Sequence, residues 1–287
     1  MNLKFIFFLL LFSCNLSAQQ NVITFDFGSY AVSLLSEGQR QGNTGILIGA
    51  TDEMLKECVP DGKFPNATNV FLVETGEKTI LFDAGYGRNL FDNLKKLKRS
   101  ADDVDIVILT HMHGDHIGGL LRDGKKSFPK AMLYIPRPEH DYWMSDKAGN
   151  SANARKVIEM YKDKLQLFEP GTIEKPQELI KGIKSVAAYG HTPGHTGYLL
   201  ESDGSKLLIW GDLTHAMAIQ MSYPQVAVTY DVDPQMAVKY RQEILKYVSE
   251  NKIPIAGMHI QYPAIGNVRK KASGGYEFNL ICECEGR

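Results

Sequence analysis

Six neighbouring residues concentrate side chains that bind transition metals. Residues 111–116, "HMHGDH", contain three histidines and one aspartate, although the whole chain has only eight histidines. Imidazoles combined with a few carboxylates suit zinc, iron, manganese or cobalt better than calcium. We therefore interpret this segment as part of a metal site rather than as an exposed helix start that happens to be rich in histidine.

The spacing within the segment indicates two neighbouring ions. His111 and His113 follow an apolar run at residues 104–109, which is typical of a strand buried on both faces. In extended backbone, residues two apart face the same way, so both imidazoles can converge on one ion. Asp115 and His116 come at the start of an expected helix, where the turn can aim them at a second ion. The segment thus predicts half of a two-metal site.

Three further residues offer the missing ligands, and each follows an expected strand. His195 lies in "GHTPGHTG", Asp212 in "LLIWGDLTH" and His259 in "IAGMHIQYP". Taken singly, a histidine is more often a hydrogen-bonded structural residue, and an aspartate after a strand often caps a helix. Their shared position at strand ends favours a ligand role for all three.

The elements that must position these residues alternate along the chain. Short β-like runs such as "NVFLVET" and "KTILFDAG", separated by the turn "TGEKT", predict a hairpin. Apolar residues at helical spacing predict four helices, at residues 90–97, 138–144, 153–165 and 236–248. Because strands alternate with helices in both halves, we predict an α/β fold of two sheets sandwiched between helices. We assign residues 19–287 to one domain.

The N-terminal segment has a different character. Residues 1–18 have the layout of a secretory signal, with Lys4 before an apolar run at residues 5–12 and small or polar residues after it. The run is too short to span a bilayer. We expect cleavage after Ala18, with lipidation at Cys14 and a retained anchor as alternatives. All three predict an exported protein, periplasmic or secreted; cleavage would leave no stable membrane span in the mature form.

Net charge and cysteine count limit the classes of binding partner and the disulfides that we expect. A net charge of −1 gives no electrostatic footprint for nucleic acid or acidic membranes. Cys58, Cys282 and Cys284 would remain after signal cleavage. A chain of this length can bury a sufficient core without a disulfide framework, so we predict none. A single bridge from Cys58 to the C-terminal pair stays open.

The whole series of motifs points to a known family. "HMHGDH", "TPGHTG", "WGDLTH" and "GMHIQYP" resemble the metallo-β-lactamase superfamily, over essentially the whole chain after the signal. The resemblance implies an αββα sandwich, two mixed β-sheets flanked by helices, with two metal ions at one edge of the sheets. "HDYWMS" and "AGMHIQYPAIG" are similar to the methyl parathion hydrolase branch, a neighbour of the N-acyl homoserine lactonases. That branch also implies a homodimer.

The resemblance implies three ligands for each ion and one shared carboxylate. We choose His195 over His191 because the family's ligand in "HTPGH" is the second histidine, and we leave His191 and His140 as structural residues. The implied set is His111, His113 and His195 for one ion, Asp115, His116 and His259 for the other, and Asp212 as the bridge.

The same resemblance implies two residues of a substrate pocket. Trp143 matches an aromatic residue that lines the leaving-group pocket of the branch, with a core or surface tryptophan as the alternative. His215, three residues after Asp212, also matches the branch, with a structural histidine as the alternative. Zinc is the expected metal at both positions, and manganese, iron or cobalt are alternatives.

Together these features predict a binuclear metal-dependent hydrolase of small-molecule esters. Two cations about 3.5–4 Å apart clamp a bridging water and lower its pKa toward about 7, so that it attacks a carbonyl or phosphoryl centre. Asp115 and Asp212 are the residues that we expect to be catalytic. Aryl esters, lactones and phosphotriesters all fit this chemistry.

Other functions stay open as alternatives. A dedicated N-acyl homoserine lactonase is disfavoured because "LTHAMAIQ", after Asp212, has no tyrosine close behind; β-lactamase activity comes third. A catalytically inactive metal- or partner-binding protein would keep the fold alone, but the complete ligand set argues against it. Flavin-linked oxygen reduction is disfavoured because the enzymes of this fold that perform it usually have a carboxylate in place of His113. RNA processing is disfavoured because of the export signal.

Overall fold

The computed structural model describes residues 21–281. The expected signal at residues 1–18 and the cysteines Cys282 and Cys284 lie outside the described residues. Signal cleavage, lipidation at Cys14 and a bridge to Cys58 therefore stay predictions. Among residues 21–281, no helix is both long enough and apolar enough to cross a membrane.

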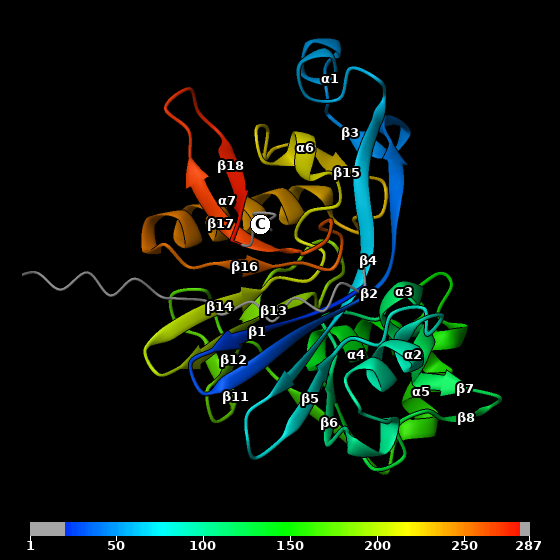
Figure 1. The fold of residues 1–287 in the computed structure, drawn as a ribbon. Helices are drawn as coiled ribbons and strands as arrows, with labels where there is room; N and C mark the ends of the chain where they lie inside the picture. Colours follow the sequence, from blue (N-terminus) through cyan, green and yellow to red (C-terminus); the bar gives the residue numbers. More distant parts are fainter. Residues whose placement is uncertain (1–20, 282–287) are drawn as a thin grey trace, which may run out of the picture.

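Two seven-stranded sheets form the body of the protein (Figure 1). The first has the order β1-β2-β4-β5-β6-β9-β10, from Val22–Phe27, Tyr30–Asn43, Lys63–Glu74, Thr79–Phe82, Ile106–Ile108, Met132–Pro136 and Leu165–Phe168. The second has the order β11-β12-β13-β14-β16-β17-β18, from Gln177–Ile180, Ile183–Ala187, Thr196–Ser202, Ser205–Ile209, Ile255–Ala256, Ile265–Lys270 and Tyr276–Leu280. β5 and β14 each have one antiparallel and one parallel neighbour, which confirms two mixed sheets.

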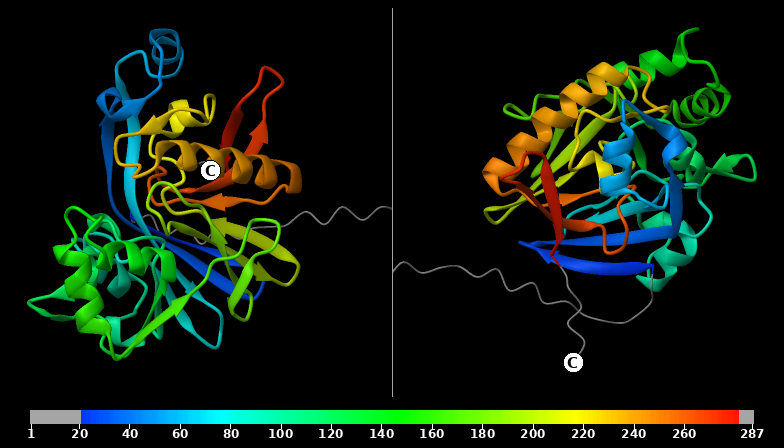
Figure 2. Two further views of the ribbon diagram at one scale, coloured as in Figure 1. Left: turned by 180° about the vertical axis from the view of Figure 1, so that it is seen from behind. Right: turned by 90° about the horizontal axis from the view of Figure 1, so that it is seen from above.

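Helices lie beside both sheets (Figures 1 and 2). Next to the first sheet are α2 (Leu90–Lys96), α3 (Gly114–Ile117), α4 (Arg137–Met144) and α5 (Ala152–Tyr161), with the short 3-10 turns η2 (Ala101–Asp103) and η3 (Gly118–Leu120) and the hairpin β7 (Leu121–Arg122) and β8 (Lys125–Lys126). α7 (Pro234–Asn251) packs beside the second sheet. The predicted helices are confirmed, but the one expected over residues 153–165 ends at Tyr161, because a turn at residues 162–164 leads into strand β10, which starts at Leu165 and pairs with β9.

Alternate residues of β4 face two different cores. Phe71 and Val73 are fully buried between the two sheets, whereas Val70 and Leu72 are fully buried between the first sheet and its helices. Consecutive side chains of a strand point to opposite faces, so burial on both faces explains the unbroken apolar run in this strand. β6, which precedes residues 111–116, is fixed on two sides in the same way, by Ile106 and Ile108 on one face and Val107 on the other.

Beyond their pairing with β1 and β5, β2 and β4 continue as a two-stranded arm of residues 36–43 and 63–69 (Figure 1). Its tip carries η1 (Thr44–Ile46), β3 (Leu47–Ile48) and α1 (Asp52–Cys58), and β3 pairs with β15 (Ala227–Val228). Phe64 of the arm packs with Ile219 of α6 (Met217–Gln220) and with Val226 in a separate small core. This contact holds the arm against the segment that follows Asp212.

Candidate metal centre

The expected ligands come from the ends of strands in both sheets. Residues 111–116 follow β6 of the first sheet and begin α3. In the second sheet, His191 and His195 lie between β12 and β13, Asp212 follows β14 and His259 follows β16. The site therefore joins the two halves of the sandwich.

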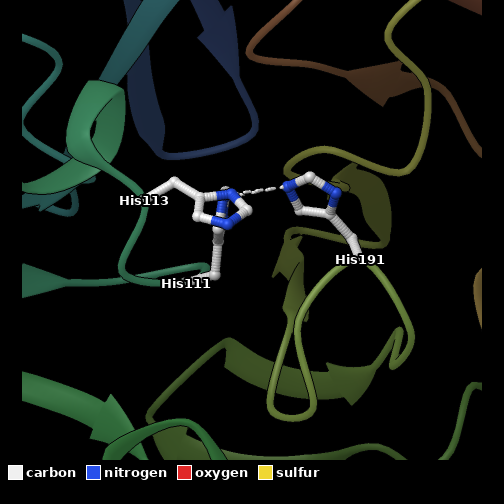
Figure 3. A group of neighbouring side chains, drawn as sticks. All are labelled: His111, His113 and His191. Carbon is white, nitrogen blue, oxygen red and sulfur yellow. Dashed lines mark hydrogen bonds between the residues drawn. The ribbon is translucent and has the colours of Figure 1, made fainter. Parts of the chain in front are cut away.

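Three histidines converge on one point (Figure 3). Nδ1 of His113 lies 3.0 Å from Nε2 of His111 and 2.9 Å from Nε2 of His191, and the last two atoms are 3.2 Å apart. Nitrogens bound to one tetrahedral zinc, at about 2.0–2.1 Å from it, lie roughly 3.3–3.4 Å from each other. These three, here called the first group, have the spacing of ligands to a single ion.

The other ring nitrogens of His191 and His111 are fixed by neighbouring residues. Nδ1 of His191 lies 3.0 Å from a carboxylate oxygen of Asp231, and Nδ1 of His111 lies 3.0 Å from the Thr110 hydroxyl. The Thr110 hydroxyl itself donates to Asp83, at 2.8 Å, so it accepts from His111. Both Nδ1 atoms thus carry the proton, and both Nε2 atoms keep the lone pair that a metal needs.

Burial also keeps the first group uncharged. It lowers the pKa of His113 to about 4 and the pKa values of His111 and His191 well below their ordinary value. Metal binding requires unprotonated imidazoles, so the low pKa values favour ligation.

A second group consists of Asp115, His116 and His259. Nε2 of His116 and Nε2 of His259 lie 3.8 Å and 3.6 Å from the Asp115 carboxylate. Their Nδ1 atoms lie 2.7 Å from an oxygen of Asp83 and 2.8 Å from the carbonyl of Ala67. As for His111 and His191, these contacts direct Nε2 of both rings at the centre.

Asp212 lies between the two groups. Its Oδ2 is 3.4 Å from Nε2 of His191 and 2.8 Å from Nε2 of His259, and its Oδ1 is 3.2 Å from Nε2 of His116. Against the effect of burial, the surrounding histidines, His116 and His259 first, hold the pKa of Asp212 well below its usual range. A carboxylate that touches both groups has the geometry of a bridging ligand.

Two buried atoms at this centre fit a cation. Within residues 21–281, neither Nε2 of His116 nor Oδ1 of Asp212 has a hydrogen-bond partner. Buried polar atoms are rarely left without one, so an unpaired acceptor inside a cluster of ligands calls for an explanation. A cation held by the second group would pair both atoms, and the converging nitrogens of the first group have the spacing for another, so the residues present fit two metal ions.

His195 does not occupy the place expected from the sequence. Its Nδ1 lies 2.8 Å from the carbonyl of Ala188, and its Nε2 accepts a hydrogen bond from the backbone N–H of Asp212 at 2.9 Å. The turn explains the exchange: the N–H of Ala188 donates to the carbonyl of His195, which places His195 at the base of the turn and His191 further out. The third member of the first group is His191, which the sequence interpretation left as structural.

The two residues expected in the substrate pocket differ in their placement. His215 lines a cavity of about 510 Å³ beside the two groups, and its Nε2 lies 3.1 Å from Oδ2 of Asp212. Trp143 does not line this cavity: it is buried, its indole N–H donates to Glu139 at 2.6 Å, and its ring meets His113 edge-on. His140 lies outside the cavity, beside Asp141.

The opposite wall of the cavity comes from the arm and two tyrosines. Arg40 is half exposed in the wall, with Nη1 2.7 Å from the Thr68 hydroxyl and Nη2 4.0 Å from Oδ2 of Asp115. Tyr86 and Tyr230, both exposed, add aromatic surface. The cavity thus offers both an apolar wall and a cation next to the second group.

Three buried carboxylates of this site were missed from the sequence. Asp83 holds His116, Asp231 holds His191, and Glu139 binds the backbone beside both histidine-bearing loops. Asp83 carried a usable signal, since it follows strand β5 as Asp212 follows β14. No sequence pattern marks Asp231 or Glu139, because only the fold brings their segments to the site.

Comparison with known proteins identifies the family of this chain. A family model described as the metallo-β-lactamase superfamily matches residues 64–252. The lactamase-like protein aptB of Emericella nidulans is 46% identical over 149 residues, which are 50% of this chain and 39% of that protein. The matched segments span between 20% and 60% of the length of the curated relatives.

Two solved structures share the fold over nearly their whole length. The hydrolase AbOPH of the β-lactamase superfamily has a TM-score of 0.83 at 24% identity, covering 94% of this chain and 100% of that chain. AidC, a dizinc quorum-quenching lactonase, has a TM-score of 0.84 at 25% identity, covering 92% of this chain and 99% of that chain. The αββα sandwich is confirmed, and the chain belongs to the metallo-β-lactamase superfamily.

Proposed function

We propose that this protein is an exported, binuclear metal-dependent hydrolase that cleaves ester-type bonds in small molecules. The observation that supports it best is the place of Asp212, whose carboxylate touches both groups beside an open cavity. Two bound divalent ions, zinc by preference, would lower the pKa of a water between them and polarise the oxygen of the bond to be cleaved.

The side chains of this protein divide the remaining tasks. Asp212 joins the two groups, and Asp115 adds a second negative charge that offsets the positive charge of the centre. His195 fixes the backbone of Asp212 by accepting a hydrogen bond from its N–H. His215 lies in the cavity 3.1 Å from Asp212, where its ring can donate a hydrogen bond to the departing oxygen.

The cavity wall supports a moderately apolar substrate. Tyr86 and Tyr230 offer aromatic surface for an aryl or acyl group, and Arg40 offers hydrogen-bond donors to an oxygen near the cleaved bond. Aryl esters, lactones and phosphotriesters match this combination. The similarity of "HDYWMS" and neighbouring segments to the methyl parathion hydrolase branch supports the same range.

A dedicated N-acyl homoserine lactonase is the second candidate. AidC, which is 25% identical over 92% of this chain, is described as a dizinc quorum-quenching lactonase. The missing tyrosine after Asp212 counts less than the sequence indicated, because Tyr230 lines the cavity and its ring centroid lies 5.7 Å from that of His215. The phenol group of Tyr230 therefore lies in the cavity close to the two groups, although it comes from a later segment than the sequence pattern required.

One comparison of substrates separates these candidates. We would measure kcat/KM of the metal-loaded protein for an acyl-homoserine lactone, an aryl carboxylic ester and the matching phosphotriester. A lactone preference of about 100-fold, or about 2.7 kcal/mol of transition-state stabilisation, would assign the lactonase role. A flat or aryl-favouring profile supports the broader hydrolase. No hydrolysis of any of the three, with two metals bound, would leave the inactive metal-binding alternative.

Two further parts of the proposal need separate tests. Export and cleavage after Ala18 are tested by mass spectrometry of the protein recovered from the periplasm or medium. The homodimer implied by the resemblance is tested by light scattering of the purified mature protein.

A further inference from the structure

Glu139 is a buried carboxylate outside the cavity that binds donors from three segments. It lies in the first turn of α4 and is 0% exposed. It accepts four hydrogen bonds: from the backbone N–H of Met112 at 2.9 Å, the indole N–H of Trp143 at 2.6 Å, the Thr192 hydroxyl at 2.6 Å and the backbone N–H of Gly194 at 3.0 Å.

The two oxygens of this carboxylate serve the two loops of the first group. Oε1 accepts from Met112, the residue between His111 and His113. Oε2 accepts from Thr192, the residue after His191, and from Gly194. One side chain thus connects both sides of the 2.9 Å gap between His113 and His191.

The backbone of Glu139 sets the same contact independently. A Cβ added to Gly194 would lie 2.0 Å from the backbone nitrogen of Glu139. Real Cβ atoms do not approach so closely, so the loop of His191 packs directly on the first turn of α4. Glycine allows this approach because it has no side chain.

The surroundings of Glu139 suit only the ionised carboxylate. Burial raises the pKa of Glu139, but all four groups around it are placed as donors, and these stabilise the charged form. A neutral amide at this position would turn its own N–H groups toward at least one pair of donors. The position therefore distinguishes glutamate from its isostere glutamine.

We propose that Glu139 is a positioning residue that sets the separation of His113 and His191, and so controls metal binding at the first group without touching metal or substrate. The proposal rests on the metal-binding part of the proposed function and not on any substrate. Residues that orient metal ligands typically change metal affinity about 10- to 100-fold when they are replaced.

The test compares metal binding by Glu139→Gln and the unchanged full-length protein. Metal stoichiometry and affinity are measured by chelator competition, and the site is identified from the visible spectrum of the cobalt(II)-loaded protein. His191→Ala and His259→Ala give reference spectra for loss of the first or second group. We expect one ion to bind about 10- to 100-fold more weakly in Glu139→Gln, with a residual spectrum matching that of His191→Ala.

Glu37→Gln is the matched control. Glu37 is also buried, at 8% exposure, and its carboxylate accepts from the backbone N–H groups of Tyr86, Asn89 and Leu90. Its replacement should cost stability while both ions bind with unchanged affinity. Equal weakening in both variants would show a general effect of lost stability and would overturn the proposal.

Milder variants cover the case in which Glu139→Gln does not fold. Trp143→Phe and Thr192→Val each remove one donor and keep the carboxylate. We expect partial weakening of the same ion in both, and wild-type affinity for both ions would overturn the proposal. If both ions bind as expected but no ester is hydrolysed, the proposed function fails while the role of Glu139 stands.

Discussion

Nε2 of His195 accepts the backbone N–H of Asp212 at 2.9 Å, so His195 holds the central carboxylate in place without joining either group. The two histidines of the "HTPGH" motif therefore have different tasks. His191 completes the first group, and His195 supports the residue between the groups.

This division predicts different outcomes for two alanine variants. His191→Ala removes a member of the first group and should lose one of two bound ions. His195→Ala should keep both ions but lose about 1–3 kcal/mol of stability, because it leaves the buried N–H of Asp212 unpaired. Metal analysis and denaturant unfolding of both variants check this, and loss of an ion only in His195→Ala would reverse the assignment.

Replacement of the central carboxylate should affect both groups at once. We expect Asp212→Ala to bind less metal and to lose at least about 100-fold in kcat/KM, the scale of losing one major electrostatic contribution. Asp92→Ala, an exposed aspartate on α2, is the control. A variant with wild-type rate and two bound ions would disprove the bridge.

Removal of metal should lower stability in a way that only suitable ions restore. A ligand at 100 times its Kd adds about 2.7 kcal/mol to the folded state. We expect dialysis against a strong chelator to lower Tm, and zinc, cobalt or manganese to restore it. Calcium should not restore it, because five of the seven residues in the two groups and their bridge are histidines. Thermal unfolding with each ion in turn is the measurement, and an unchanged Tm on chelation would contradict the binding of two ions.

The turn that carries His191 should tolerate no side chain at Gly190. This residue has φ of +117°, and an added Cβ would lie 2.0 Å from the backbone nitrogen of Ala237 on α7. Gly204→Ala is the matched control, since its φ is +80° but nothing lies within 4 Å. The control should cost about 1–2 kcal/mol of backbone strain, and Gly190→Ala clearly more. Equal midpoints in urea unfolding would contradict the close approach.

Arg40 should affect the KM for particular substrates and leave kcat unchanged. Its guanidinium faces the cavity and is tied to the Thr68 hydroxyl by one short hydrogen bond. We expect Arg40→Gln to raise KM about 10- to 100-fold for an ester that carries a second carbonyl, the value of a charged hydrogen bond of about 1.5–3 kcal/mol. KM for a simple aryl ester should stay the same. A uniform fall of kcat for both esters would assign Arg40 to the chemistry instead.

The spacing of residues predicted most members of the two groups, but it did not show which of two nearby histidines belongs to the first group. His111 and His113 could be paired from the sequence because a strand puts alternate residues on one side. His191 and His195 could not be separated, because a turn of four residues has no fixed period and its hydrogen bonds decide which ring reaches inward. Trp143 was misplaced for a related reason: the sequence does not show that Glu139 on the same helix draws its indole away from the cavity.

The regular elements were easier to predict than the supporting carboxylates. The strands buried on both faces and the amphipathic helices have patterns that depend on local sequence alone. Asp231 and Glu139 reach the site only through contacts between segments distant along the chain, such as the 40 residues that separate Asp231 from His191. No local pattern reports such a contact.

The arm of β2 and β4 has a consequence for how this protein can change over evolutionary time. The groups that would hold metal come from strand ends in the two sheets, whereas Arg40 comes from the arm. Part of the wall that would select the substrate is therefore encoded in a different stretch of the gene from the metal-holding residues. Substitutions at Arg40 can therefore redirect the protein to new compounds, provided that Ala67, the arm residue whose carbonyl holds the ring of His259, stays in place.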